Sequence, residues 1–187
     1  MLRAVAHAVP GMPLIASGGF ADGQGLAAAL ALGAGAAQFG TRFMASTEVN
    51  LHPNYKKALL RAAVEDTRTV GHGLGVIRAV RNAFTERMAA LETSSGELDA
   101  RRAAFTAFSL KMAAHDGDVT NVKVEAGQSV SLVGTVIPVV EIVRRLVEEY
   151  VAAVTELPRC APGAETVVRT LSPPMLSAPG ALLPATP

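Results

Sequence analysis

Residues 13–45, with the sequence PLIASGGFADGQGLAAALALGAGAAQFGTRFMA, decide the fold of this chain. Residues 14–16 are short and apolar without polar alternation, which is typical of a parallel strand covered on both faces. A helix is predicted between Asp22, whose carboxylate suits an N-cap, and Gly33, which suits the turn after the last helical residue. Residues 36–39 form a second apolar strand. The stretch therefore predicts one βαβ unit.

Both predicted strands end in residues that expose the backbone. Gly18 and Gly19 follow the first strand, and Gly40 and Thr41 follow the second. Converging N–H groups, a hydroxyl and a nearby helix N-terminus favour an anion. A (β/α)₈ barrel binds phosphate in this way, through the loops after its seventh and eighth strands. The alternative is that these glycines only make the tight turns of an ordinary α/β protein.

Several segments resemble the nitronate monooxygenase family. The most specific are ASGGFADG at 16–23, AALALGA at 28–34 and QFGTRF at 38–43. Weaker support comes from later short motifs, which are HPNYK at 52–56, RAVRNAFT at 78–85, GDVTN at 117–121 and AGQ at 126–128. The resemblance covers residues 1–150. This family is also called 2-nitropropane dioxygenase and is similar to the flavin-type enoyl-acyl-carrier-protein reductases.

The resemblance implies an FMN-dependent TIM barrel in which the ends of the seventh and eighth strands hold the flavin phosphate. A phosphate dianion suits converging N–H groups and a hydroxyl better than one charged side chain. The residues that the resemblance assigns to cofactor binding are Gly18, Gly19, Gln38, Phe39, Gly40 and Thr41. At 121–128 this chain has NVKVEAGQ where the family has Asn-Gly-x-Val-x-x-Gly-Gln, so we assign no ligand role to that segment.

Length limits what this chain can contain. A complete (β/α)₈ barrel takes about 250 residues and eight strands, whereas this chain has 187 residues and two convincing barrel strands. The resemblance places Met1 just before the seventh strand and the family's catalytic histidine upstream of it. We therefore expect an α/β fold, the C-terminal part of a TIM barrel with an added helical segment. We expect neither a catalytic residue nor a metal site, and structural or surface roles for His7, His52, His72 and His115.

The rest of the chain reads as mainly helical. We expect a first helix at 54–65, with Tyr55, Leu59 and Leu60 inside, and a second helix at 76–91. A third helix is expected after a capping box at Ser94 and Glu97, and a fourth after Pro138. Arg78 and Arg81 would lie a turn apart on the second of these, facing either an anionic ligand or solvent. The expected segments are 1–50 with the barrel strands, 51–157 as the helical part that completes the barrel, and 158–187 as a Pro-rich disordered tail.

Composition excludes several classes of protein. Half of the residues are hydrophobic and 18% are charged, against about a quarter in typical domains. A net charge of +1 gives no electrostatic basis for nucleic-acid binding. The single cysteine, Cys160, excludes an internal disulfide. No basic leader pattern and no long apolar run is present, so we expect no membrane span and a cytoplasmic protein.

The resemblance implies oxidation of an alkyl nitronate by FMN and dioxygen to a carbonyl compound and nitrite. One alternative is an enoyl reductase, which would need a nicotinamide hydride donor. Another is a non-catalytic fragment whose exposed strand edges dock onto another chain. The expected partners are a small-molecule substrate and dioxygen, with homo-oligomerisation or pairing with the remaining barrel portion also open.

Overall fold

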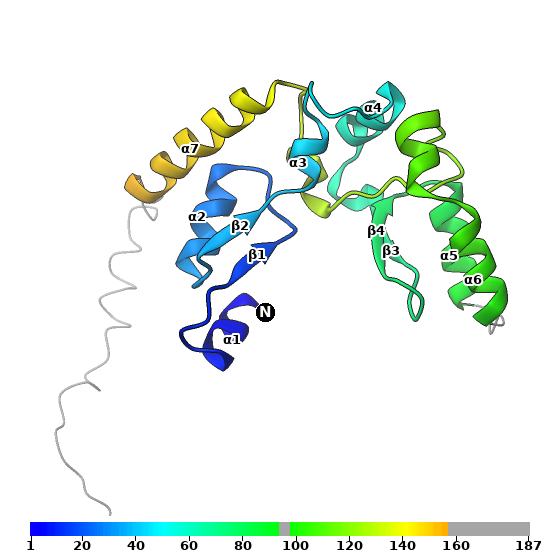
Figure 1. The fold of residues 1–187 in the computed structure, drawn as a ribbon, viewed down its shortest axis with the longest axis horizontal. Helices are drawn as coiled ribbons and strands as arrows, with labels where there is room; N and C mark the ends of the chain where they lie inside the picture. The colour runs from blue at the N-terminus through cyan, green and yellow to red at the C-terminus, as the bar shows by residue number, and fades with distance from the viewer. Residues whose placement is uncertain (94–97, 157–187) are drawn as a thin grey trace, which may run out of the picture. The chain divides into compact units, whose positions relative to one another are not determined.

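The computed structural model describes residues 1–93 and 98–156 (Figure 1). Residues Met1–Thr155 form one compact unit. Its first half contains α1 (Leu2–Ala8), β1 (Ile15–Ser17), α2 (Gly23–Ala31), β2 (Ala36–Gln38), α3 (Thr41–Met44) and α4 (Pro53–Arg61). Its second half contains the short turn η1 (Val64–Asp66), β3 (Thr67–Val70), β4 (Ile77–Val80), α5 (Ala83–Thr93), α6 (Leu98–Ala107), η2 (Met112–Asp116), η3 (Gln128–Leu132) and α7 (Val139–Thr155). The predicted capping box at 94–97, Cys160 and the predicted tail at 158–187 lie outside the described residues.

The predicted βαβ unit is confirmed. β1 and β2 pair in parallel, with Ser17 opposite Gln38. Asp22 caps α2, because its carboxylate accepts from the Gly25 N–H at 2.7 Å. Gly33 ends the helix with a φ of +99°. Its N–H donates to Leu30 and the Ala34 N–H to Ala29, the two hydrogen bonds of a Schellman motif.

The prediction that the first strand is covered on both faces is wrong for the described residues. Only Ala16 of β1 is buried, and Ile15 is 68% exposed. The sequence is apolar enough for a doubly covered strand, but β2 is the one strand that pairs with it in the described chain. Within the described residues, the Ile15 side of β1 is therefore not covered by another element.

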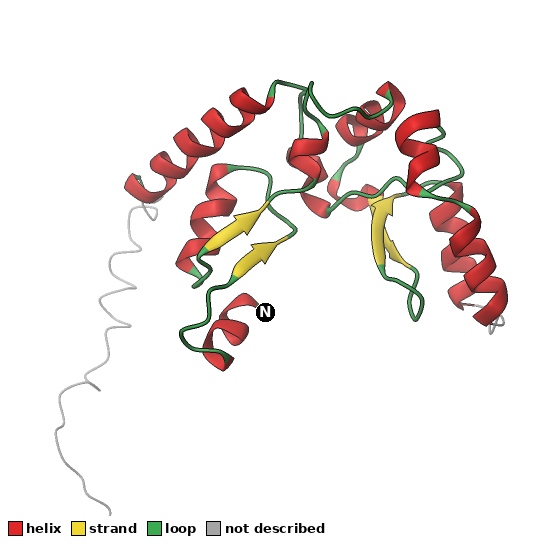
Figure 2. Cartoon of the chain, in the orientation of Figure 1, coloured by secondary structure: helices red, strands yellow, loops and turns green. Residues whose placement is uncertain are grey.

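The predicted helix at 76–91 is wrong over its first half. β4 pairs antiparallel with β3 there, and α5 begins only at Ala83 (Figure 2). Gly71 and Gly73 adopt positive φ in the turn between the strands, which suits a hairpin. β-Branched residues in β4 then pair with β3, so tertiary pairing overrides the helical spacing. A helix at α5 was expected, and Asn82 caps it by accepting from the Thr85 N–H at 3.1 Å.

Arg78 and Arg81 consequently do not lie a turn apart on a helix. The Arg78 side chain donates to the Thr67 hydroxyl at 3.2 Å across the hairpin. The Arg81 backbone N–H donates to the Asp66 carbonyl, and its side chain is exposed. The two arginines therefore serve the hairpin and the surface.

Two apolar clusters form the interior around α4 and α5. The first gathers Tyr55 and Leu59 of α4 with valines that follow Asp118, which are Val122, Val124 and Val130. The second gathers Val70, Phe84 and Met88. Tyr55 and Leu59 are fully buried as predicted, whereas Leu60 is 37% exposed, and α4 ends at Arg61.

The last helix packs against the βαβ unit. α7 follows Pro138 as predicted and buries Ile142 and Leu146. It crosses α2 so closely at Gly23 that a Cβ there would lie 2.4 Å from the Leu146 carbonyl oxygen. The Glu149 carboxylate accepts from the Gly23 N–H at 2.8 Å, which caps the start of α2 from another helix.

Candidate functional site

The ends of β1 and β2 lie at one edge of the parallel pair. Because Ser17 pairs with Gln38, the turns that begin at Gly18 and Phe39 leave the strands at the same level. Gly18 and Gly19 both have a φ of +84°, a conformation that L side chains rarely adopt. The Phe20 and Phe39 rings lie with centroids 6.3 Å apart, which joins the two turns. The structure therefore brings the predicted glycine turns together.

Open space lies over the backbone of these turns. A Cβ built on Gly18, Gly19 or Gly40 would meet no atom within 4 Å. Gly40 is the N-cap of the short helix α3, and the first N–H groups of a helix have no partner within it. The exposed backbone there is accessible to a ligand with oxygen acceptors. Gln38 is exposed at the end of β2 and Phe39 is half-buried.

Thr41 differs from the other predicted residues because it is 7% exposed. Its Oγ1 accepts a hydrogen bond from the Gly127 backbone N–H at 3.0 Å. A hydroxyl that accepts from one side keeps its own hydrogen to donate elsewhere. The contact fixes the hydroxyl oxygen and leaves the O–H available.

Sequence reasoning missed the contact with Gly127. The residues are 86 positions apart, and we assigned no ligand role to the segment around Gly127 because Val122 departs from the family pattern. The AGQ motif at 126–128 was the available signal. The structure places this segment against the end of the second strand.

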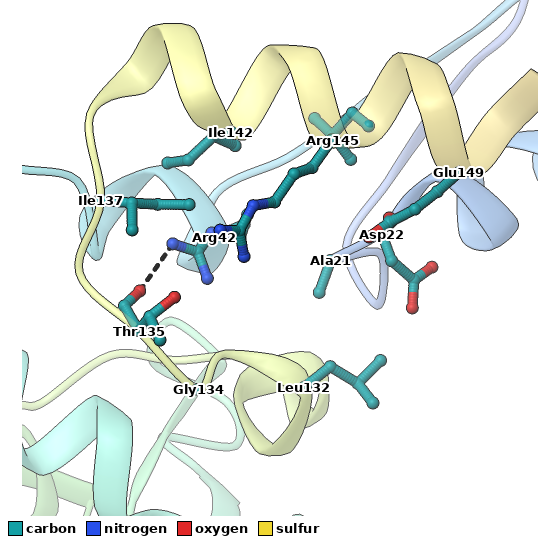
Figure 3. A pocket seen from close by; sticks show the side chains of 11 residues that line it. Ala21, Asp22, Arg42, Leu132, Gly134, Thr135, Ile137, Ile142, Arg145 and Glu149 are labelled. Carbon is teal, nitrogen blue, oxygen red and sulfur yellow. Dashed lines mark hydrogen bonds between the residues drawn. The ribbon is translucent and has the colours of Figure 1, made fainter.

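Arg42 was also missed, although it lies inside the QFGTRF motif. Its side chain is 7% exposed, and its Nη2 donates to the Thr135 carbonyl at 2.7 Å and the Ala45 carbonyl at 3.3 Å. It lines a pocket of about 240 Å³ together with residues of α7 and of the loops after β1 and η3 (Figure 3). Burial, and next the charge of Arg145, lowers the pKa of the Arg42 guanidinium, while Glu149 raises it.

None of the hydrogen bonds that the structure gives the four histidines involves a residue at the ends of β1 and β2. The Arg3 guanidinium donates to His7 Nε2 on α1, and His52 caps α4 by accepting from the Asn54 N–H at 3.1 Å. His72 pairs with Glu92 at 2.8 Å, and His115 is exposed in η2. In the described ranges no three His, Cys, Asp or Glu residues gather as metal ligands, and no helix is long and apolar enough to cross a membrane.

Comparison with known sequences agrees with the motifs. The family model described as nitronate monooxygenase matches residues 1–149. A nitronate monooxygenase of Paraburkholderia phytofirmans is 49% identical over 75 residues, which are 40% of this chain and 20% of that protein. A probable nitronate monooxygenase of Staphylococcus aureus is 31% identical over 128 residues, which are 68% of this chain and 36% of that protein.

Solved structures that resemble this one include two enzymes. FabK from Thermotoga maritima matches with a TM-score of 0.76 and 36% identity, covering 83% of this chain and 49% of that chain. Nitroalkane oxidase from Streptomyces ansochromogenes matches with a TM-score of 0.67 and 31% identity, covering 83% and 44%. This chain thus spans less than half the length of these relatives. The matches confirm the predicted fold class, part of a TIM barrel, and the described residues do not close a barrel.

Proposed function

This chain belongs to the nitronate monooxygenase family, a family of oxidoreductases, and from that premise we propose that its two glycine-bearing strand ends hold the phosphate of FMN. The observation that carries the proposal is the parallel register of β1 and β2, which sets both glycine turns at one edge. The residues proposed for cofactor binding are Gly18, Gly19, Gln38, Phe39, Gly40 and Thr41.

The residues at this edge fit a phosphate. The three glycines carry no side chain where a phosphate oxygen would approach, and the space above them is open. Thr41 contributes an O–H whose oxygen is already fixed by the Gly127 N–H. Backbone N–H groups and one hydroxyl together offer donors to a dianion without placing a competing charge next to it.

FMN, when bound, supplies the redox chemistry that oxidises an alkyl nitronate with dioxygen to a carbonyl compound and nitrite. The residues of this chain bind and orient the cofactor through its phosphate. We assign no catalytic residue to this chain, as the family resemblance implies. A cytoplasmic location and the segment boundaries at 50 and 157 remain predictions.

A second candidate is a flavin-dependent enoyl reductase, and the likeness to FabK favours it. The same phosphate site serves either reaction, because it holds the cofactor and leaves the substrate to other residues. The two candidates differ in the reductant, since an enoyl reductase takes a hydride from a nicotinamide nucleotide.

Activity assays on the full chain with FMN distinguish these candidates. Nitrite release and oxygen consumption with an alkyl nitronate support nitronate oxidation. Oxidation of NADPH with an enoyl thioester, without oxygen consumption, supports the reductase. If the chain binds FMN but supports neither reaction, the catalytic part of the proposal fails for this chain and its cofactor part stands.

A further inference from the structure

We propose that the pocket between α3, α7 and the loop before α7 is a second anion site, which binds a small oxyanion through Arg42 and Arg145. The pocket encloses about 240 Å³, and both guanidinium groups line it. Figure 3 shows Arg42 and Arg145 reaching toward each other from α3 and α7. The ligand class is a small carboxylate or phosphate, which shares the planar or tetrahedral oxygen acceptors that guanidinium groups bind.

Arg42 is a buried cation whose hydrogen bonds go only to neutral groups in the described chain. Its Nη2 donates to two carbonyl oxygens, and its Nε is buried without any partner among the described residues. Burying a charge without a counterion is unfavourable. Glu149 raises the pKa of Arg42 without forming an ion pair with it in the described chain, so an oxyanion in the pocket would give this guanidinium a directly bonded counterion.

Arg145 adds a second positive charge to the same wall. Its Nε donates to Glu141 at 2.7 Å, and its side chain is 49% exposed, so part of the guanidinium faces outward. The repulsion between Arg145 and Arg42 contributes to the lowered pKa of Arg42. An anion between the two arginines would offset that repulsion with two attractions.

The carboxylates that line the pocket are already engaged. Asp22 accepts from the Gly25 N–H, and Glu149 accepts from the Gly23 N–H. Both serve the start of α2, and neither forms an ion pair with an arginine in the part of the chain that the structure describes. Neither carboxylate therefore occupies the guanidinium groups that we propose as the anion site.

This pocket and the proposed flavin site share no residue. Neither the glycine turns nor Thr41 lines it. Although Thr41 and Arg42 are adjacent in sequence, the Thr41 hydroxyl bonds to Gly127 and the Arg42 guanidinium bonds to Thr135. The two sites can therefore be tested by different variants.

The test is calorimetric titration of the full chain with inorganic phosphate and, separately, with malonate, at constant ionic strength. We expect saturable binding of at least one of them and a loss of affinity of about tenfold in Arg145→Gln. Arg144→Gln is the matched control, because Arg144 also pairs with Glu141 but does not line the pocket. Its affinity should equal that of the wild type.

Arg42→Lys is the second variant, which keeps the charge and loses the forked donor geometry, and circular dichroism reports whether it folds. FMN affinity should be unchanged in Arg145→Gln, which separates this proposal from the flavin site. The proposal is overturned if neither anion binds saturably, or if Arg145→Gln binds as the wild type does. It is also overturned if Thr41→Val abolishes phosphate binding while Arg145→Gln retains it, since the phosphate would then occupy the flavin site.

Discussion

At the scale of single residues, Thr41 has one observed contact and one proposed binding role, and the two can be separated. Its oxygen accepts from the Gly127 N–H, which ties the end of β2 to the segment before η3. Its hydrogen is free for the phosphate that we propose. The first role concerns stability and the second concerns binding, so one substitution should alter two independent measurements.

Thr41→Val keeps the shape of the side chain and removes both hydrogen-bonding functions. We expect a loss of about 1 kcal/mol in the free energy of unfolding, because the Gly127 N–H is left without its acceptor. We also expect FMN affinity to fall about fivefold to tenfold. Chemical denaturation and flavin fluorescence titration measure the two effects. Thr41→Ser keeps the hydroxyl and should retain most of the stability and most of the FMN affinity. Equal FMN affinity in the wild type, Thr41→Val and Thr41→Ser would contradict the role of the hydroxyl.

Local residue chemistry was predictable where the partners are near in sequence. Asp22 and Gly33 cap α2 as expected, because an N-cap carboxylate and a left-handed glycine act within one helical turn. The partner of Thr41 and the burial of Arg42 could not be predicted. Both depend on residues more than eighty positions away, which only the fold brings near.

At the scale of elements, Gly23 controls how closely α2 and α7 pack. A Cβ at this position would lie 2.3 Å from the Tyr150 backbone nitrogen, against backbone that cannot move aside. Gly23→Ala should therefore destabilise the protein by about 1–3 kcal/mol in denaturant unfolding. Gly35→Ala is the matched control, because its nearest neighbour would be at 3.7 Å. An equal effect of the two changes would show that the close helix crossing is absent in solution.

The ion pairs at the start of α7 predict a pH dependence. Hydrogen bonds from Arg144, and next from Arg145, lower the pKa of Glu141 from 4.5 to about 2. Because the pKa is lower in the folded state, these pairs stabilise α7 fully above about pH 4.5, and that stabilisation is lost as the pH falls toward 2.

Thermal melts followed by circular dichroism should therefore show a lower melting temperature across this pH range. The melting temperature should fall less over this pH range in Glu141→Gln than in the wild type. Glu148→Gln is the control, because Glu148 pairs with Arg144 alone. A pH profile that is the same in the wild type and Glu141→Gln would rule out these ion pairs as the source.

The helical spacing of apolar residues at 76–91 predicted one helix where the structure has a strand followed by a helix. Ile77, Val80, Phe84 and Met88 recur at helical intervals, yet the first two belong to a strand and the last two to a helix. Ile77, Phe84 and Met88 pack in the cluster that contains Val70, whereas Val80 packs against the cluster of Tyr55 and Leu59. Strand and helix therefore both contribute side chains to the interior. The Gly-rich turn at 71–75 was the local signal for a hairpin.

At the scale of the whole molecule, α7 carries an apolar stripe on its outer face. Val140, Val143, Val147, Val151 and Val154 are each 45% exposed or more. Such a stripe on an otherwise amphipathic helix favours association. We expect light scattering to give a mass above the 19.3 kDa of the single chain. Val147→Lys should raise the monomer fraction, whereas Val64→Lys, at an equally exposed valine outside α7, should not; a monomeric wild type contradicts this prediction.

The fold class and the position of the two glycine turns at one edge could be predicted because they rest on one contiguous βαβ unit. The exposed face of β1 could not be predicted, because an apolar strand sequence does not show which elements cover the strand. The same limit applies to the outer valines of α7, whose spacing is equally typical of a buried helix face.

The most direct test of the central claim compares FMN with riboflavin, which carries the same ring system and lacks the phosphate. If Gly19, Gly40 and their neighbours bind the phosphate, the chain should bind FMN at least about tenfold more tightly than riboflavin. This ratio corresponds to a difference of about 1.4 kcal/mol in binding free energy. Equilibrium dialysis of both flavins against the full chain measures this ratio. Equal affinities, or no binding of FMN, would contradict the account.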